Sequence, residues 1–433
     1  MALVLLSVGC AKDSERAASA REALAPDVLA GVLRASPLPP VPVDPTNAFA
    51  DDPRAAHFGR VLFYDERFSA NGEISCATCH DPDLGWADGS VTAAGLSSFG
   101  LHTPSLWNVA HNRWFFWDGR ADTLWSQAVE PWEHPNEMGG DRVSFVRLLA
   151  ADEELSGLYT ELFGPLPDVQ GWPATAKPVS GGGSHPMQMA WDEMSEESQE
   201  AATRVIVNLA KSVAAFERLI VTSETAFDRY VRGLRDGDPE DLSALGPEEL
   251  HGMELFFSDA RCHLCHHGPF FTDLEFHDVR LPYETGADGE PVREMGRWDG
   301  IQAVLKSPLN SEGVYSDSPA GEGEGGPVIS GSAHGHLEYL LRSTHTKGEF
   351  KTPGLRNVGK TAPYTHRGIY ESLEQVIAHY SELADAPPKR HEDVEEILVP
   401  VHLAEVEVAA LAAFLRSLDS PYAGSELRPL NVD

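Results

Sequence analysis

Four of the chain's five cysteines stand in two copies of one pattern, Cys76-Ala-Thr-Cys79-His80 and Cys262-His-Leu-Cys265-His266. A Cys-X-X-Cys-His run attaches a c-type haem: the two thiols add across the haem vinyl groups, and the adjoining histidine ligates the iron. Zinc is the alternative, because cysteine and histidine pairs also bind zinc. Zinc sites, however, usually close with a second pair about 12–20 residues further on, and these two patterns lie far apart. The sequence therefore predicts two haem c groups and redox chemistry.

The two halves of the chain also share a pattern that contains no cysteine. The matched stretches are Thr103-Pro-Ser-Leu-Trp-Asn-Val109 and Thr352-Pro-Gly-Leu-Arg-Asn-Val358, and the spacing continues through Gly119 with Gly368 and Leu124 with Leu373. Matching through proline and glycine at one fixed spacing indicates a repeated structural unit. We therefore expect a mostly α fold of two cytochrome c-like haem domains, related by internal duplication and carrying long loops.

This duplication gives the two haems different surroundings. At one matched position the first half has Pro131 and the second half has Tyr380. A tyrosine oxygen can ligate haem iron, whereas a proline side chain cannot. Haem 1, attached at Cys76, is expected to keep an open sixth position for a small molecule, and haem 2, attached at Cys262, is expected to be closed by Tyr380. The alternative for Tyr380 is a half-buried helix tyrosine with no ligand role.

The chain has 433 residues, 42% of them hydrophobic, and a formal net charge of −34. This length allows two domains, each with a hydrophobic core. The strong acidity argues against nucleic acid or an anionic membrane surface as a partner. It suits a basic redox partner, although acidity alone also serves solubility.

The first residues resemble an export signal. Residues 1–10 form a short apolar run that ends in small residues and Cys10, as at the lipidation site of a bacterial lipoprotein. The alternative is an ordinary cleaved signal with an incidental thiol, and no Lys or Arg precedes Cys10. Both interpretations predict a periplasmic protein, with a membrane contact only through a lipid anchor at Cys10. Residues 11–52 are rich in Ala and Pro and are expected to form a tether.

Two haem domains are expected to follow, over residues 53–235 and 240–424. Apolar residues at helical spacing predict helices, and they are Val205, Leu209, Val213, Phe216 and Ile220 in the first domain and Leu250, Met253, Phe257, Val408, Leu411, Leu415 and Leu418 in the second. Residues 284–347 are dense in Gly, Ser, Asp and Glu and are expected to form a long loop or insertion.

From about His57 to Leu418, the chain resembles the bacterial di-haem cytochrome c peroxidase family and, within it, the MauG-like branch. The motifs of the first half are Leu62-Phe-Tyr-Asp65, Ser75-Cys-Ala-Thr-Cys-His80, Phe115-Phe-Trp-Asp-Gly-Arg120 and Pro135-Asn-Glu-Met-Gly139. Those of the second half are Gly268-Pro-Phe-Phe-Thr-Asp273, Phe350-Lys-Thr-Pro-Gly-Leu-Arg-Asn-Val358 and Ala362-Pro-Tyr364. The resemblance implies an oxidoreductase that reacts with hydrogen peroxide.

The resemblance also implies roles for residues near haem 1. Trp117 matches a tryptophan that relays electrons between the haems, although core packing is the commonest role of a tryptophan. Glu137 matches the acid–base residue over the open haem, where one carboxylate with a tuned pKa can take and return a proton. A lone glutamate is more often a surface charge, so this role depends on the motif. Gln127 matches a hydrogen-bonding residue of the pocket, and Pro131 lines it.

A calcium ion is implied at positions that match Thr361 and Pro363, whose backbone carbonyls would hold it. The side-chain ligand in the family is an asparagine just before the Thr-Pro of the first half. This sequence has His102 there, and histidine is a poor ligand for calcium.

Three further positions separate this chain from particular relatives. Classical members carry a histidine in the loop after the first haem motif that blocks the resting site, and residues 89–100 contain none. Classical members use methionine as the sixth ligand of haem 2, whereas Tyr380 matches the tyrosine of MauG. MauG has a tryptophan before its second haem motif that passes oxidising equivalents to a protein substrate, and the matching residue here is Ala260.

We therefore expect hydrogen peroxide to react at haem 1, with electrons relayed through haem 2 from a small redox protein, a cytochrome c or a cupredoxin. The first alternative is MauG-like oxidation of side chains on a partner protein. Tyr380 and the histidine-free loop favour that alternative, and Ala260 disfavours its best-known form. The second alternative is a non-catalytic electron-transfer cytochrome, which would need protein ligands on both faces of both irons.

Overall fold

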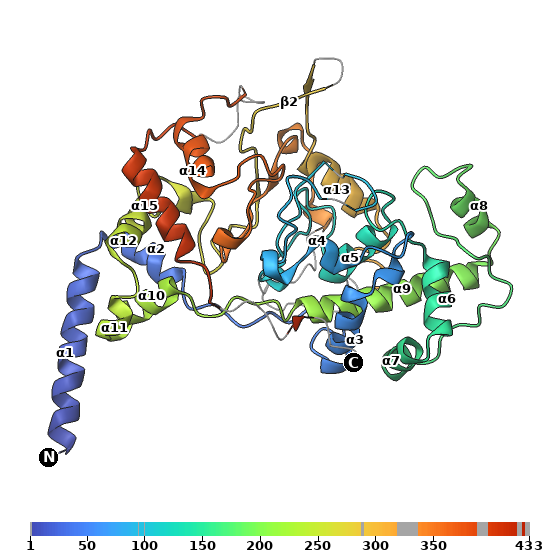
Figure 1. The fold of residues 1–433 in the computed structure, drawn as a ribbon, viewed down its shortest axis with the longest axis horizontal. Coiled ribbons are helices and arrows are strands. Elements are labelled where there is room, and N and C mark those ends of the chain that lie inside the picture. Colours follow the sequence, from blue (N-terminus) through green and yellow to red (C-terminus); the bar gives the residue numbers. More distant parts are fainter. Residues whose placement is uncertain are drawn as a thin grey trace. The chain divides into compact units, whose positions relative to one another are not determined.

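The computed structural model describes residues 2–93, 95–98, 100–286, 290–317, 337–387, 397–421 and 427–428 (Figure 1). The fold is mostly helical, as the sequence predicts. The strands in the described residues form two short antiparallel pairs, β1 (Phe276–His277) with β4 (Phe350–Lys351) and β2 (Glu284–Thr285) with β3 (Pro291–Val292). Cys10 lies in the N-terminal helix, but its side chain is outside the described part of the chain, so its lipidation stays a prediction.

The chain divides into two compact units, which we name after their first haem-motif cysteine. The Cys76 unit contains Val41–Val221, Asp299–Arg342 and Gly424–Asp433, and the Cys262 unit contains Met1–Pro40, Thr222–Trp298 and Ser343–Ala423.

The helices of the Cys76 unit are α3 (Pro53–Tyr64), α4 (Cys76–Cys79), α5 (Leu124–Glu133), α6 (Arg142–Ala151), α7 (Glu153–Phe163), α8 (Pro186–Asp192), α9 (Glu196–Glu217) and most of α13 (Arg297–Lys306). Those of the Cys262 unit are α1 (Ala2–Glu22), α2 (Pro26–Arg34), α10 (Ala226–Asp236), α11 (Pro239–Leu242), α12 (Pro247–Phe256), α14 (Leu373–Glu382) and α15 (Glu405–Arg416). Short 3-10 turns are η1 (Glu66–Phe68), η2 (Pro82–Leu84), η3 (Val109–His111), η4 (Cys262–Leu264), η5 (Leu337–Tyr339), η6 (Thr344–Thr346) and η7 (Val358–Lys360). None of the helices in the described residues has the length and apolar character needed to cross a bilayer.

A close crossing of two helices forms the centre of each unit. In the Cys76 unit α3 packs on α9, and a Cβ added to Gly59 would lie 1.8 Å from the Ser212 carbonyl oxygen. In the Cys262 unit α12 packs on α15, and a Cβ added to Gly252 would lie 1.9 Å from the Ala410 carbonyl oxygen. Both crossings therefore require glycine, because any side chain would meet the backbone of the partner helix.

Helices form at the predicted amphipathic stretches, although Ile220, Phe257 and Leu418 lie just beyond the ends of α9, α12 and α15. The apolar face of α9 is buried, with Val205, Leu209, Val213 and Phe216 each 2% exposed or less. Ser195 caps its first turn by accepting a hydrogen bond from the Ser198 amide. The same pattern buries the inner face of α15 against α12. Burial of these faces positions the haem motifs, because α3 and α12 each lead into one of them.

The local backbone repeats at the positions that the sequence comparison matched. Left-handed residues, Asn108 and Asn357, precede the turns η3 and η7. Isolated bridges join Phe115 to Ala121 and Tyr364 to Tyr370. The helices α5 and α14 then begin at matched residues, and hydroxyl side chains cap both, Thr123 on α5 and Ser372 on α14.

The structure differs from the tether expected over residues 11–52. This stretch contains α2, and Val28 and Val32 lie in the core of the Cys262 unit at 4% and 0% exposure. The Ala35 carbonyl accepts a hydrogen bond from Arg356 within the same core. Ala-rich and Pro-rich composition suggested an unstructured chain, but the apolar spacing of α2 allows it to pack.

The expected domain boundaries also differ from the units. Residues 299–342 belong to the Cys76 unit, although they follow the second haem motif in the sequence. The buried Asp122 accepts hydrogen bonds from the amide and hydroxyl of Ser311, and the buried Lys211 donates to the Tyr315 carbonyl. The described parts of the loop expected over 284–347 contain α13 and two short strands rather than irregular chain alone.

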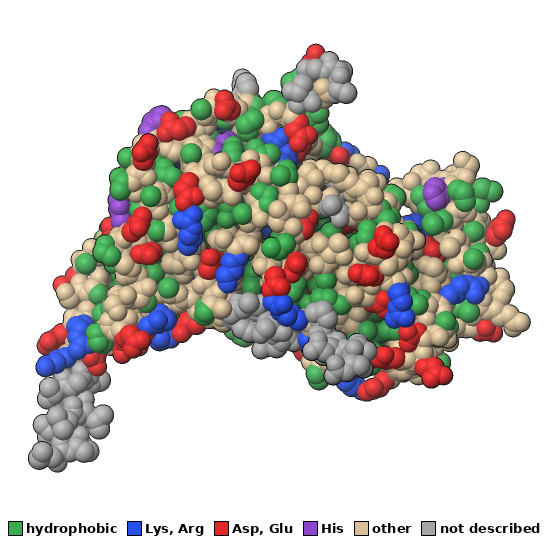
Figure 2. Space-filling model, in the orientation of Figure 1, with side chains coloured by type: hydrophobic (Ala, Val, Ile, Leu, Met, Phe, Trp, Pro, Cys, Tyr) green, Lys and Arg blue, Asp and Glu red, His purple; other side chains and the backbone are tan. Residues whose placement is uncertain are grey.

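Acidic side chains are scattered over the face of the molecule that Figure 2 shows, with Lys and Arg among them. They do not gather in one patch on that face. The net charge of −34 therefore does not by itself indicate a docking surface on this face.

Candidate functional site

The first haem motif folds as a single helical turn. Cys76 and Cys79 bound α4, and His80 follows directly. The His80 Nδ1 lies 3.0 Å from the Trp86 carbonyl oxygen. Because a carbonyl only accepts, Nδ1 carries the proton, and the lone pair of His80 is on Nε2. Burial also lowers the pKa of His80, which keeps the ring neutral as an iron ligand requires.

The second motif repeats this arrangement. Cys262 opens the turn η4, and the His266 Nδ1 lies 2.9 Å from the Phe271 carbonyl oxygen. Trp86 and Phe271, the two acceptors, both have left-handed backbones, with φ of 60° and 54°. In both units a backbone carbonyl therefore fixes the histidine tautomer that leaves Nε2 for a metal. Two Cys-X-X-Cys-His turns with this tautomer fit haem c.

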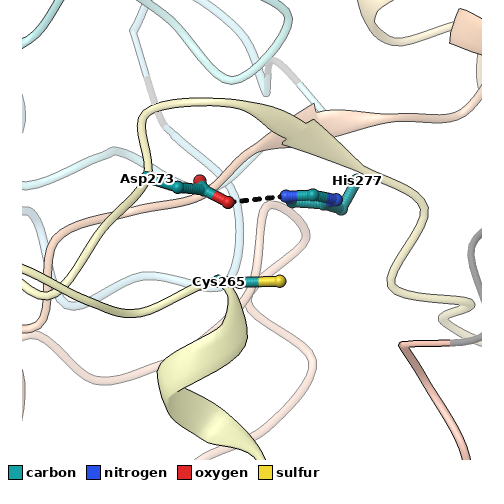
Figure 3. A group of neighbouring side chains, drawn as sticks. All are labelled: Cys265, Asp273 and His277. Carbon is teal, nitrogen blue, oxygen red and sulfur yellow. Dashed lines mark hydrogen bonds and ion pairs between the residues drawn. The ribbon is translucent and has the colours of Figure 1, made fainter. Parts of the chain in front are cut away.

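A mixed cluster of possible metal ligands lies beside the second motif. Cys265, Asp273 and His277 bring ligand atoms within 4.8 Å of one another, and Figure 3 shows the Asp273 and His277 side chains pointing toward each other. The His277 Nε2 lies 2.8 Å from Asp273, and this hydrogen bond, together with one to Cys265, raises the pKa of His277 to about 10. Asp273 and His277 therefore form a hydrogen-bonded pair beside Cys265, the residue whose sulfur the second motif would use for haem attachment.

Glu137 lies in the short segment between α5 and α6. Its side chain is only 19% exposed, and its Oε1 atom is buried without a hydrogen-bond partner. Burial raises the pKa of Glu137 to about 7. Its charge acts on both thiols of the first motif, since it contributes to the raised pKa of Cys76 and of Cys79. The structure thus brings Glu137 to the haem 1 attachment site with a pKa suited to proton transfer near neutrality.

Two charged neighbours oppose each other at Glu137. Arg120 lowers the pKa of Glu137, whereas Glu130 raises it. These neighbours pair with each other, because the Arg120 Nε donates to Glu130 at 2.7 Å. His134 lies 3.6 Å from the Glu137 carboxylate, and burial lowers the pKa of that histidine. Burial outweighs the effect of the Arg120 charge, so the pKa of Glu137 stays raised.

Gln127 and Pro131 lie one turn apart on α5, the helix that leads to Glu137. Gln127 Oε1 is buried without a hydrogen-bond partner, as are the indole nitrogens of Trp86 and Trp107. Buried polar atoms are rarely left unpaired. Several such atoms in the Cys76 unit fit a site that is completed by a bound group.

Tyr380 is on α14, the counterpart of α5. It is partly buried, and its pKa is raised by burial and then by Cys265 and Cys262. These electrostatic effects place the phenol near the second pair of cysteines. An iron cation would lower that pKa, since an opposite charge favours the ionised form. Tyr380 is therefore in the right unit to face haem 2.

The remaining predicted residues have these surroundings. Trp117 is 9% exposed, and its indole N–H donates to the His102 carbonyl at 2.7 Å. The His102 Nδ1 lies 2.8 Å from the Ser90 carbonyl oxygen. Thr361 directly follows the turn η7, and the Ala362–Pro363 peptide bond is cis. A calcium site at Thr361 and Pro363 stays a prediction, as does electron relay by Trp117.

Two buried charged residues near the site were not identified from the sequence. Glu217, the last residue of α9, is 4% exposed, and burial alone raises its pKa to about 8. It also contributes to the raised pKa of Cys76. Lys177 is 7% exposed, and it hydrogen-bonds the carbonyls of Glu133 and Gly140. Neither belongs to a motif, so only tertiary burial reveals them.

Residues 53–236 match the family model described as di-haem cytochrome c peroxidase. The cytochrome c peroxidase IdrP1 of Pseudomonas sp. strain SCT is 28% identical over 411 residues, which cover 91% of this chain and 90% of the relative. MauG of Methylorubrum extorquens is 29% identical over 380 residues, which cover 87% of this chain and 82% of the relative.

Solved structures share the fold at lower identity. The di-haem peroxidase BthA of Burkholderia thailandensis superposes with a TM-score of 0.60 at 21% identity, covering 90% of this chain and 91% of that chain. A MauG-like protein associated with microbial copper homeostasis gives a TM-score of 0.58 at 23% identity, covering 89% of this chain and 95% of that chain.

Proposed function

Because this chain belongs to the di-haem cytochrome c peroxidase family and is an enzyme of the di-haem peroxidase type, we propose that it reacts with hydrogen peroxide at an open haem in the Cys76 unit. Its resemblance to a peroxidase family is confirmed, and the roles of the individual haems are our proposal. Haem 1 would be held by Cys76, Cys79 and His80. When bound, its iron supplies peroxide binding and the electrons that break the O–O bond.

The main support for this proposal is the burial of the Glu137 carboxyl group and its raised pKa. Its buried Oε1 has no hydrogen-bond partner, and its pKa of about 7 leaves it partly ionised near neutrality. The carboxylate can take the proton from the peroxide oxygen that binds iron. It can then return that proton to the other oxygen, which leaves as water. Gln127, with its own unpaired oxygen, can orient peroxide by accepting a hydrogen bond.

The Cys262 unit would hold haem 2 through Cys262, Cys265 and His266, and Tyr380 would supply a further iron ligand. The matched local backbones of the two halves support an internal duplication in which Pro131 and Tyr380 are counterparts. Ligation by Tyr380 would close haem 2 to peroxide, and electron exchange with haem 1 through Trp117 is a separate part of the proposal.

Two electron sources are chemically distinct. A small redox protein, a cytochrome c or a cupredoxin, would make the enzyme a peroxidase. Oxidation of side chains on a partner protein, as MauG-like maturation would require, is the second candidate, and the position of Tyr380 favours it. Ala260 packs against the core of the Cys262 unit, and it cannot serve as a redox-active exit. We therefore place the peroxidase first, in the periplasm, with a lipid anchor at Cys10 and a calcium ion at Thr361 and Pro363 as parts of the proposal.

Binding of cyanide or carbon monoxide to the isolated holoprotein tests the open site. We expect one of the two haems to bind the added ligand and the other to keep its spectrum. Binding at neither haem would instead support an electron-transfer cytochrome.

A further inference from the structure

The segment that carries Glu137 is held in place by backbone hydrogen bonds on one side. The Leu96 amide donates to the Glu137 carbonyl at 2.8 Å, and the Ser97 amide donates to the Asn136 carbonyl at 3.0 Å. A Cβ on Gly95 would lie 2.5 Å from the Glu137 Cα, so the two segments are in close contact. The described part of the loop after the first haem motif is therefore attached to the Glu137 segment.

Elsewhere the segment is held by further backbone bonds, such as the Ala70 amide to the Met138 carbonyl at 2.8 Å, and by one side chain that reaches both of its ends. Lys177 donates to the carbonyl of Glu133, which ends α5, and to the carbonyl of Gly140 at 2.7 Å. These two carbonyls bracket residues 134–139. The ammonium group therefore joins the two ends of the segment that carries Glu137, and it also faces the negative end of the α5 dipole.

The backbone next to Lys177 is held at the start of α6 by hydrogen bonds of Ala176. The amide of its neighbour Ala176 donates to the buried Asp141 carboxylate at 2.8 Å, and the Ala176 carbonyl accepts from Val143. Asp141 caps α6, so the position of Lys177 follows from the start of that helix. Burial lowers the pKa of Lys177, whereas Glu133 and Asp141 raise it. The carbonyls of Glu133 and Gly140 both accept hydrogen bonds from the buried ammonium group of Lys177.

We propose that Lys177 is a positioning residue for Glu137: by bonding both ends of residues 134–139, it keeps the carboxyl group of Glu137 directed into the buried haem 1 site. This inference rests on the proposed function, since it assigns Lys177 to the reaction through Glu137. Burial raises the pKa of Glu137, with smaller and opposite effects of Arg120 and Glu130, and Lys177 is not among these causes. The charge of Lys177 acts instead on His134, which lies beside the carboxylate.

Removing Lys177 should therefore release the segment that carries Glu137. In a Lys177→Met variant we expect Glu137 to become hydrated, and its pKa to fall from about 7 toward about 4.3, the value of an exposed glutamate. The limiting rate constant for the reaction with peroxide should fall about 10- to 100-fold, because small misplacements of a catalytic group have effects of that size.

Lys211 offers a matched control in the same unit. It is 3% exposed, and its Nζ bonds the Tyr315 carbonyl and Asp317, each at 2.8 Å. A Lys211→Met variant removes a buried lysine and two partners without touching residues 134–139. We expect it to lose stability and yet keep the pH midpoint and limiting rate of the parent protein.

The test combines two measurements on the holoprotein variants. Amide hydrogen exchange at Leu96, Ser97 and Glu137 should become faster in Lys177→Met and stay slow in Lys211→Met. The pH profile of the reaction with peroxide should lose its midpoint near 7 only in Lys177→Met. A Lys177→Arg variant keeps donors for both carbonyls, so it should restore slow exchange and the midpoint, and it remains informative if Lys177→Met does not fold.

The outcomes separate this proposal from the proposed function. Slow exchange and an unchanged profile in Lys177→Met would overturn the positioning role. Fast exchange in both methionine variants would also overturn it, because the effect would then be general loss of stability. If Glu137→Gln leaves the reaction unchanged while Lys177→Met still releases the segment, the proposed function of Glu137 fails instead.

Discussion

Replacement of Glu137 by glutamine tests the proposed chemistry with the least structural change. Glutamine keeps the size of the side chain and its carbonyl acceptor, but it cannot transfer a proton. Burial raises the pKa of Glu137 from 4.5 to about 7, which corresponds to about 3 kcal/mol of disfavoured ionisation. The native protein therefore holds a carboxylate that water would stabilise better, and Glu137→Gln removes that cost together with the base.

Activity and stability should then change in opposite directions. The rate constant for peroxide should fall by about 10²- to 10⁴-fold, the usual contribution of one acid–base group. Between pH 4.5 and about 7 the folded state binds more protons at Glu137 than the unfolded state does. Stability therefore falls as pH rises through this window, by at most about 3 kcal/mol. Glu137→Gln lacks this loss and should be the more stable protein above neutrality.

The assay is rapid mixing of the fully ferric holoprotein with hydrogen peroxide across this range of pH. In the parent protein the second-order rate constant should rise about tenfold per pH unit below the pKa and level off above it, because the carboxylate is the base. In Glu137→Gln it should be low and independent of pH. A Glu137→Gln protein that keeps the parental rate and profile would refute the role of Glu137.

Three other predictions follow from the same electrostatics and ligand assignments. Glu130→Gln should move the pH midpoint of the peroxide reaction below 7 and keep the limiting rate, because the variant removes a charge that raises the pKa of Glu137 and leaves Arg120 to lower it; a midpoint that stays or rises would contradict this. Glu217 has a folded pKa of about 8, so it costs stability increasingly as pH rises from about 4.5 to 8; Glu217→Gln should flatten the pH dependence of thermal unfolding, and equal slopes in both proteins would show that Glu217 is solvated. Tyr380→Phe should change the optical and EPR spectra of one haem and leave cyanide binding at the other unchanged, whereas an unaltered spectrum would show that Tyr380 is not a ligand.

Much of the site could be predicted from the sequence because short-range chemistry defines it. The Cys-X-X-Cys-His runs place two thiols and a histidine on one turn, and the apolar periods of α9 and α15 specify which helix faces are buried. Glu137 and Gln127 could be identified as candidate site residues only from the family motifs that contain them. The structure adds that Glu137 is buried and that burial raises its pKa to about 7.

The features that the sequence did not reveal depend on long-range packing. The return of residues 299–342 to the Cys76 unit depends on bonds such as Ser311 to Asp122, which join positions far apart in the chain. The burial of Glu217 and Lys177 has the same origin, since a lone charged residue is normally exposed. The tether expected over residues 11–52 was wrong for a related reason. That prediction used composition alone, whereas the spacing of the apolar residues allows α2 to pack into the core.

The most direct test of the account is to add one equivalent of hydrogen peroxide to the fully ferric holoprotein and to follow its optical and EPR spectra. We predict a rapid reaction without prior reduction, because residues 89–100 contain no histidine and the Glu137 carboxylate can accept a proton near pH 7. The ferric signals of both haems should decrease together, since the two share the oxidising equivalents. No reaction until one haem has been reduced would contradict the open resting site.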